Sequence, residues 1–186
     1  MNFRNHLELR GQHAFLSASN YHWINYDEDK LVDRYENMLA VKRGTELHEI
    51  AQKLISHGIK VRSSKETFNL YVNDAIGYRM TPEQILFYSP NCFGTADAIA
   101  FSEKKRFLRI HDLKTGETPA SMNQLKIYVA LFCLEYGYSP FDIGCEMRIY
   151  QFNQFVAEEH DPDEIAHIQD KIITFDKRIE EVKQEM

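Results

Sequence analysis

The chain has few cysteines, no long apolar run and no surplus of positive charge, and each shortage excludes a class of protein. Its 186 residues contain three cysteines, Cys92, Cys133 and Cys145. An odd number at such wide spacings argues against a disulfide framework and against a zinc site of the CxxC type. We therefore expect reduced thiols, with Cys133 and Cys145 in the core.

Apolar runs are only a few residues long, and the start of the chain is polar. The segment Met1-Asn2-Phe3-Arg4-Asn5-His6 lacks the hydrophobic region of a signal peptide. These features predict a soluble cytoplasmic protein that does not associate with a membrane. No glycine-rich loop of the Walker type occurs either, so the sequence does not predict ATP hydrolysis.

Size and composition predict one domain. A chain of 186 residues that is 44% hydrophobic and 12% aromatic can form one well-filled core and is short for two. No internal repeat, low-complexity tract or shift in composition marks a linker. We therefore expect a single domain that covers residues 1–186.

Periodicity predicts helices before, between and after a block of strands. The expected helices are a short one carrying Trp23 and longer ones at 39–57, 66–78, 122–136 and 163–183. The expected strands are 84–88, 93–101, 106–114, 142–152 and 155–158. This order predicts an α/β fold in which helices flank a central mixed β-sheet.

Polar residues occur at defined places in two of these strands. Asp112 and Lys114 are two apart on one strand and share a face, whereas Leu113 points into the opposite layer. Asp97 lies in the preceding strand, and the short loop Ser102 to Lys105 suits a hairpin that brings Asp97 beside Asp112. Two such carboxylates repel each other unless a cation lies between them, and oxygen ligands suit Mg²⁺ or Mn²⁺.

Each of these residues also has an ordinary interpretation when taken alone. An isolated Asp112 and Lys114 pair would be an exposed ion pair worth about 0–1 kcal/mol. His48 adjoins an apolar helix stripe and could be a boundary histidine. Gln124 and Tyr128, four apart on one helix face, could be the polar edge of a core helix. The order of all the residues along the chain is what favours a common site.

The ordered set resembles the RecB-like branch of the PD-(D/E)xK nucleases, in particular its stand-alone phage and prokaryotic exonucleases. The matching motifs are GxxxH in a helix (Gly44, His48), GxxD in a strand (Gly94, Asp97), DxK continuing into TG (Asp112, Lys114, Thr115, Gly116) and QxxxY in a helix (Gln124, Tyr128). The resemblance spans 85 of 186 residues. It implies a restriction-endonuclease-like fold and a divalent-metal-dependent DNA exonuclease that hydrolyses phosphodiester bonds with metal-activated water.

The resemblance also implies a role for each motif residue. The groups that would hold Mg²⁺ or Mn²⁺ are the side chains of His48, Asp97 and Asp112 and the backbone carbonyl of Leu113. The imidazole ligand favours tolerance of Mn²⁺. Lys114 would orient or help deprotonate the attacking water and offset charge on the phosphate. Gln124 and Tyr128 would brace Lys114 and the nucleic-acid backbone.

The resemblance has consequences for cofactors and partners. Several nucleases of this branch bind an iron-sulfur cluster through four cysteines, and the three cysteines here lack that spacing, so we expect no cluster. DNA would be the partner, in the cytoplasm of a prokaryote or a phage-infected host cell. A helicase or recombination protein acting with this nuclease would be a separate chain. An oligomer is compatible with these motifs.

The net charge of −6 is unusual for a nucleic-acid-binding protein. Basic residues nevertheless concentrate at Lys42-Arg43, at 60–65 and at 104–109. A bound metal would add positive charge. The alternative function is a catalytically silent module that binds DNA or protein on the same fold, and a hydrolase of small phosphodiesters is a third.

Overall fold

The computed structural model describes residues 7–185, which fall into two compact units, one ending at Arg43 and the other beginning at Gly44. The first unit contains two short 3-10 helices, η1 (Leu7–Leu9) and η2 (Tyr21–Asn25). The expected short helix carrying Trp23 is therefore a 3-10 helix. All the motif residues lie in the second unit. The single domain expected over 1–186 stays a prediction.

Helix α1 (Glu28–Ser56) begins well before residue 39, where the apolar pattern places its start. The Asp27 carboxylate accepts a hydrogen bond from the Lys30 backbone N–H at 2.8 Å, which satisfies a donor of the first turn. Residues 28–38 are mostly exposed. They carry no apolar stripe for a periodicity argument to detect, so the sequence-based start is too late.

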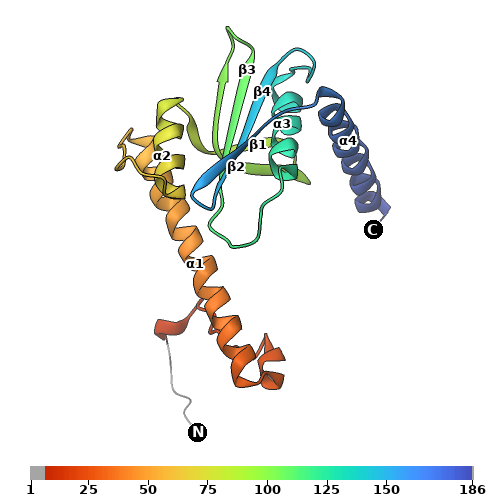
Figure 1. Ribbon diagram of the computed structural model, residues 1–186. Coiled ribbons are helices and arrows are strands. Elements are labelled where there is room, and N and C mark those ends of the chain that lie inside the picture. The colour runs from red at the N-terminus through yellow and green to blue at the C-terminus, as the bar shows by residue number, and fades with distance from the viewer. Residues whose placement is uncertain (1–6, 186) are drawn as a thin grey trace. The chain divides into compact units, whose positions relative to one another are not determined.

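Five strands form one mixed sheet in the second unit (Figure 1). In spatial order, which is also chain order, they are β1 (Thr81–Ser89), β2 (Cys92–Ser102), β3 (Phe107–Leu113), β4 (Gly144–Gln151) and β5 (Gln154–Glu159). Only β3 and β4 are parallel, because helix α3 (Asn123–Tyr136) carries the chain back between them. The expected α/β fold with a helix-flanked mixed sheet is confirmed.

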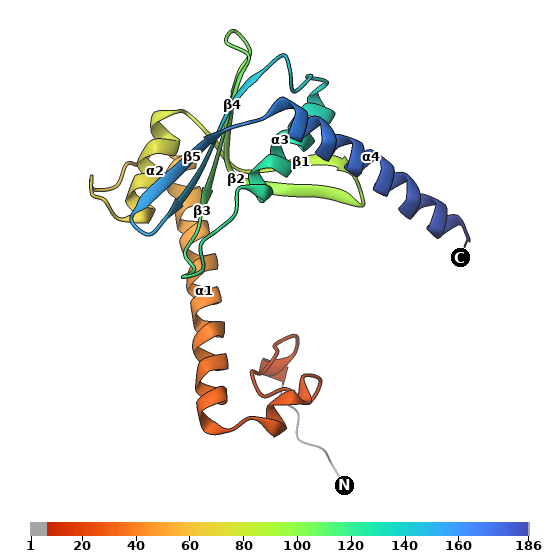
Figure 2. The ribbon, with the colours of Figure 1, turned by 45° about the vertical axis from the view of Figure 1, so that its right-hand side comes forward.

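Apolar clusters cover both faces of the sheet. One cluster joins the strands to α3 and the beginning of α4 (Pro162–Glu185), and the other joins them to α1 and α2 (Thr67–Gly77). Alternation along β3 assigns Leu108 and Ile110 to the first cluster and Leu113 to the second. Figures 1 and 2 show α2 on one side of the sheet and α3 with α4 on the other. Asp112, the neighbour of Leu113, therefore faces the α3 side.

Helix α4 packs its apolar side chains against the α3 cluster through its first turns, and its later turns are hydrogen-bonded through Asp176, Glu180 and Lys183 to Ser89 and Asn91 at the β1 and β2 turn. Ile165 is fully buried in the α3 cluster, and Ile168 and Ile172 pack against the same cluster. Farther along, side chains such as Ile173 and Phe175 are exposed. No helix within residues 7–185 combines the length and the apolar character needed to cross a membrane.

Replacing Ile165 by Ala should destabilise the second unit by about 2–5 kcal/mol, because the change removes a buried side chain and leaves a cavity. Ile173→Ala, on the same helix but 43% exposed, is the matched control and should change little. Urea unfolding of both variants measures the difference. Equal effects would contradict the anchoring role of Ile165.

Candidate metal centre beside Lys114

The β2 and β3 hairpin brings the two motif aspartates together. Ala98 pairs with His111 at the end of the antiparallel ladder, so one further step of the register sets Asp97 opposite Asp112. The negative charge of Asp112 is close enough to raise the pKa of Asp97. The hairpin predicted from the short loop is present, and it brings Asp97 beside Asp112.

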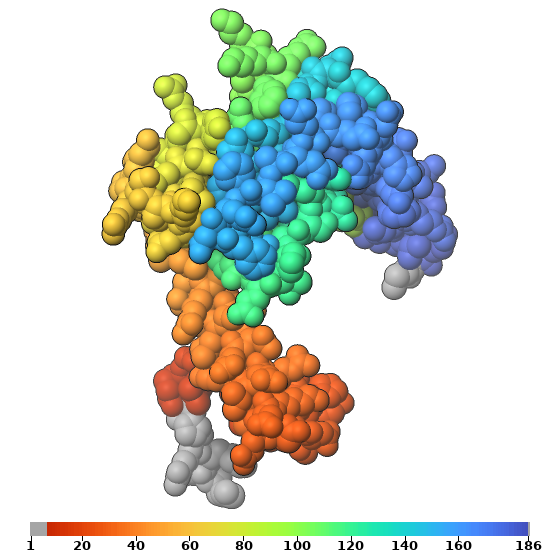
Figure 3. Space-filling model, viewed as in Figure 1, coloured from red at the N-terminus to blue at the C-terminus, as the bar shows by residue number. Residues whose placement is uncertain are grey.

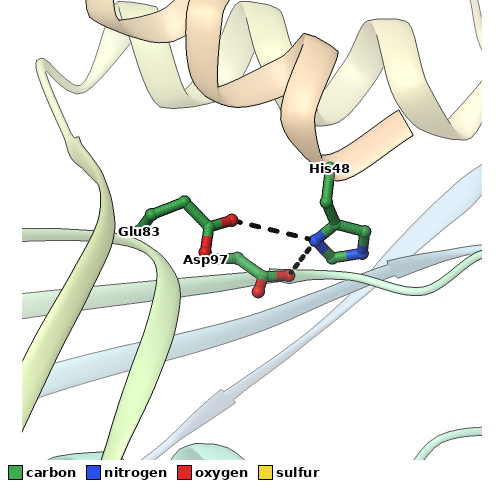
Figure 4. Close-up of side chains that lie close together, drawn as sticks. All are labelled: His48, Glu83 and Asp97. Carbon is green, nitrogen blue, oxygen red and sulfur yellow. Dashed lines mark ion pairs between the residues drawn. The ribbon is translucent and has the colours of Figure 1, made fainter. Parts of the chain in front are cut away.

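His48 reaches these carboxylates from α1 (Figure 4). Its Nδ1 lies 3.5 Å from Asp97 Oδ2 and 4.0 Å from Glu83 Oε1. One ligand atom from each of the three residues lies within 4.8 Å of the others. Ligands about 2.1 Å from a shared Mg²⁺ in octahedral geometry lie roughly 3–4 Å apart. The three side chains thus have the spacing and the donor types of a small divalent-cation site.

Glu83 is a member of this cluster that the motifs do not predict. It lies in β1 between Pro82, which pairs with Ala98, and Gln84, which pairs with Ala96. Its φ is +50°, a conformation that costs energy for a residue other than glycine and is often found at functional sites. Counting back from the Pro90-Asn91 turn would set Glu83 opposite Ala98, but the ladder is irregular between Phe87 and Ser89, and this shift of one residue sets Glu83 opposite Asp97. The sequence carries no signal for that irregularity, so the contact is not predictable from it.

Asp112 is almost completely removed from solvent. Its residue exposure is 1%, and its Oδ2 atom has no hydrogen bond of good geometry, although Lys114 Nζ is 3.0 Å away. Buried carboxylate oxygens are normally hydrogen-bonded or bound to a metal. Asp112 is not one of the three residues whose ligand atoms lie within 4.8 Å of one another, and its link to them is its charge interaction with Asp97 and His48. Its oxygen without a hydrogen bond fits a cation that Asp112 would share with that cluster.

Burial and mutual repulsion disfavour negative charge in this cluster. Burial, followed by the charge of Asp112, raises the pKa of Asp97 to about 6. Burial also raises the pKa of Asp112, although the Lys114 ammonium opposes that shift. Tyr71 of α2 is 2% exposed, and burial together with the same carboxylates raises the pKa of its phenol. A divalent cation would relieve the repulsion.

Lys114 belongs to a hydrogen-bonded chain that ends on α3. Its Nζ donates to Asp112 Oδ1 at 3.1 Å and to Gln124 Oε1 at 2.8 Å. Gln124 Nε2 in turn donates to the Tyr128 hydroxyl at 2.9 Å. The structure thus brings the DxK and QxxxY motifs into contact, and the helical spacing of Gln124 and Tyr128 holds the Lys114 ammonium next to Asp112.

Leu113 contributes to the site through its backbone, with its side chain in the opposite core as expected. Its N–H donates to Asp97 Oδ2 at 2.8 Å, which fixes that carboxylate and favours its charged form. The role expected for the Leu113 carbonyl as a metal ligand stays a prediction.

Two motif glycines allow close approach around the site. A Cβ atom at Gly44 would lie 2.8 Å from Thr115 Oγ1, and one at Gly94 would lie 2.9 Å from Tyr128 Cε1. Gly44 precedes His48 by about one helical turn, so its lack of a side chain lets α1 approach the segment that follows Lys114. Close packing against Thr115 and Tyr128 therefore favours glycine at Gly44 and Gly94.

Asp97→Asn should stabilise the metal-free protein at pH 8. The folded-state pKa of about 6 exceeds the usual 3.8, so ionisation of Asp97 opposes folding fully above pH 6 and not at all below about pH 4. The amide avoids this cost, which we expect to be about 1–3 kcal/mol.

Thermal unfolding in EDTA between pH 4 and pH 8 measures this effect, with exposed Asp170→Asn as control. The advantage of Asp97→Asn should shrink as the pH falls, and Mn²⁺ should stabilise the wild type more than the variant. A variant less stable than wild type at pH 8 in EDTA would contradict the electrostatic account.

Glu83→Gln should weaken Mn²⁺ binding by about 10- to 100-fold, because the amide keeps the shape of the side chain and removes its negative charge. Isothermal titration calorimetry measures the affinity, and Glu49→Gln, exposed on α1, is the control. An affinity equal to that of the wild type would remove Glu83 from the proposed ligand set.

Comparisons of this chain with models of known protein families, with curated proteins and with solved structures give no match. The argument for function therefore rests on the residues and geometry of the site.

Proposed function

We propose that this protein is a divalent-metal-dependent deoxyribonuclease, and specifically an exonuclease, built on a restriction-endonuclease-like fold. The observation that carries the proposal is the buried Asp112 oxygen without a hydrogen bond, which is paired with the Lys114 ammonium and interacts electrostatically with Asp97 and His48 of the neighbouring cluster. An acidic cluster alone is common. A partly buried one next to a braced lysine suits phosphoryl chemistry.

The residues that would hold Mg²⁺ or Mn²⁺ are Asp97, Asp112, His48 and Glu83. Their donor set, carboxylate oxygen with one imidazole nitrogen, suits Mn²⁺ and permits Mg²⁺. When bound, the cation would act as a Lewis acid toward the phosphate and make an attacking water more acidic.

The part of Lys114 in hydrolysis follows from its fixed position. Its ammonium, held by Asp112 and Gln124, would orient the attacking water and balance the negative charge that grows on the phosphate oxygens. The water oxygen forms a bond to phosphorus while the ester P–O bond breaks. One product carries the phosphate, and the other carries the hydroxyl that leaves with a proton. Gln124 and Tyr128 keep Lys114 aligned through this change.

The choice of DNA as substrate, and of exonuclease action, rests on the motif resemblance. The mixed sheet with helices on both faces is consistent with the fold that the resemblance implies. Partners in this proposal are DNA and, as a separate chain, a helicase or recombination protein.

Lys114→Ala should lower DNA cleavage by about 10²- to 10³-fold or more, because it removes a positive charge that acts on the transition state. Mn²⁺ and DNA binding should largely persist. The substrates are end-labelled linear DNA and covalently closed circular DNA, each with Mn²⁺, Mg²⁺ or EDTA. Lys177→Ala, at an exposed position on α4, is the control and should cleave like the wild type.

Metal-dependent loss of the linear substrate alone, absent in Lys114→Ala, is the result that the proposal predicts. Cutting of the circle as well would retain the nuclease and reject the exonuclease. Retention of DNA by the wild type with no cleavage of any DNA would instead favour the silent binding module.

A further inference from the structure

The turn between β4 and β5 has an aromatic residue in a backbone conformation that aromatic residues avoid. Gln151 pairs with Gln154, so Phe152 and Asn153 form a two-residue loop. Their φ angles are +55° and +57°, which is the signature of a type I′ turn. Asn and Gly are preferred in such turns, whereas a bulky side chain with positive φ is an outlier. Phe152 is therefore an unfavourable choice for its own turn.

Packing does not account for Phe152. Its side chain is 51% exposed, and it borders hollows on two sides instead of joining either core cluster. Phe155 of β5 makes a useful comparison at 44% exposure, because its ring packs 4.6 Å from the Arg148 guanidinium and 5.5 Å from the Tyr150 ring. No ring contact of this kind is recorded for Phe152 among the described residues. Backbone strain at an exposed aromatic side chain is typical of a binding position.

The residues on either side of Phe152 hold it in place. Asn153 Oδ1 accepts a hydrogen bond from the Thr67 N–H at 3.1 Å, and the Thr67 hydroxyl accepts one from the Asn153 N–H at 2.7 Å. This pair fixes the turn to the first residue of α2, and Figure 3 shows the blue β4 and β5 hairpin against the yellow surface of α2. These two hydrogen bonds therefore fix the position of the turn relative to α2.

On the other side of Phe152, the Gln151 side chain is hydrogen-bonded to the loop that follows Lys114. Its Nε2 donates to the carbonyls of Gly116 and Thr118 at 2.7 and 2.8 Å, and its Oε1 accepts the Ala120 N–H at 3.1 Å. The side chain is 7% exposed, so it forms a buried clamp between β4 and this loop. The Gln151 clamp therefore couples the position of the turn that carries Phe152 to the position of the loop that follows Lys114.

The Phe152 turn and the loop that follows Lys114 border an open hollow of about 430 Å³. Lys114, Thr115 and Gly116 line it together with Phe68 and Phe152. Among the described residues that line it, Lys114 is the one cationic residue, and Glu66 and Glu117 also line it. The two carboxylates would repel a second phosphate, whereas the aromatic rings suit an uncharged base. The hollow therefore fits the base and sugar of a nucleotide whose phosphate lies at Lys114.

We propose that Phe152 is a stacking platform for the nucleobase next to the scissile phosphate, and that the strain of its turn is retained for this contact. This inference rests on the proposed nuclease function. The ring would bind the π-face of any base, so it would position the nucleotide without reading sequence. The phosphodiester would then be held between an aromatic contact at Phe152 and the ammonium of Lys114.

Phe152→Asn should make the protein more stable and less active at once. Relief of the positive-φ strain should raise Tm by about 2–4 °C. Loss of the stacking partner should lower kcat/KM on end-labelled DNA by about 10- to 100-fold. Phe152→Tyr and Phe152→Trp should retain most of the activity. Phe155→Ala, the matched control, should lower Tm while leaving kcat/KM per folded molecule unchanged.

A binding measurement reports the contact directly. The probe is a set of single-stranded oligonucleotides that carry the fluorescent base 2-aminopurine at successive positions, and the protein is the cleavage-deficient Lys114→Ala variant. At the position that stacks on Phe152, the 2-aminopurine fluorescence should fall on binding. The fluorescence should not fall when Phe152→Asn is added to the same variant. Unchanged kcat/KM and quenching in Phe152→Asn, with cleavage intact in the wild type, would overturn the stacking role alone. So would a fall in Tm, which would assign Phe152 to packing. A wild type that cleaves no DNA would overturn the proposed function, and this inference with it.

Discussion

A buried carboxylate, Asp112 of β3, beside a largely buried one, Asp97 of β2, is the constraint on which the rest of this structure depends. Asp112 is nearly fully buried, and Asp97 sits opposite it with a pKa raised to about 6. A fold tolerates such a pair only where another group compensates the charge. Lys114 compensates part of it, and the orphaned Asp112 oxygen together with His48 and Glu83 suits a cation for the remainder.

The surrounding elements can be understood as supports for that pair. The β2 and β3 hairpin sets the two aspartates opposite each other, and the Leu113 N–H fixes Asp97. Helix α3 supplies Gln124 to hold Lys114, and Gly44 lets α1 approach closely enough for His48 to take part. The strained backbones of Glu83 and Phe152 lie at the edges of this arrangement, where stability is exchanged for the placement of one side chain.

Local rules predict those features that depend on spacing along one strand or one helix. The shared face of Asp112 and Lys114, the helical pair of Gln124 and Tyr128 and the hairpin between β2 and β3 all follow from periodicity and a short loop. Glu83 and Phe152 do not, because each position is set by a register or turn that contradicts the residue's own preference. The early start of α1 is likewise invisible to periodicity, since its first turns bury little.

The most direct test is a crystal structure with Mn²⁺ bound, with the ion located by its anomalous scattering. The account predicts a peak ligated by Asp97 and Asp112, with His48 and Glu83 in its coordination sphere and Lys114 Nζ beside it but not bound to it. The absence of a peak at this cluster at millimolar Mn²⁺, or an ion held by other residues, would contradict the account.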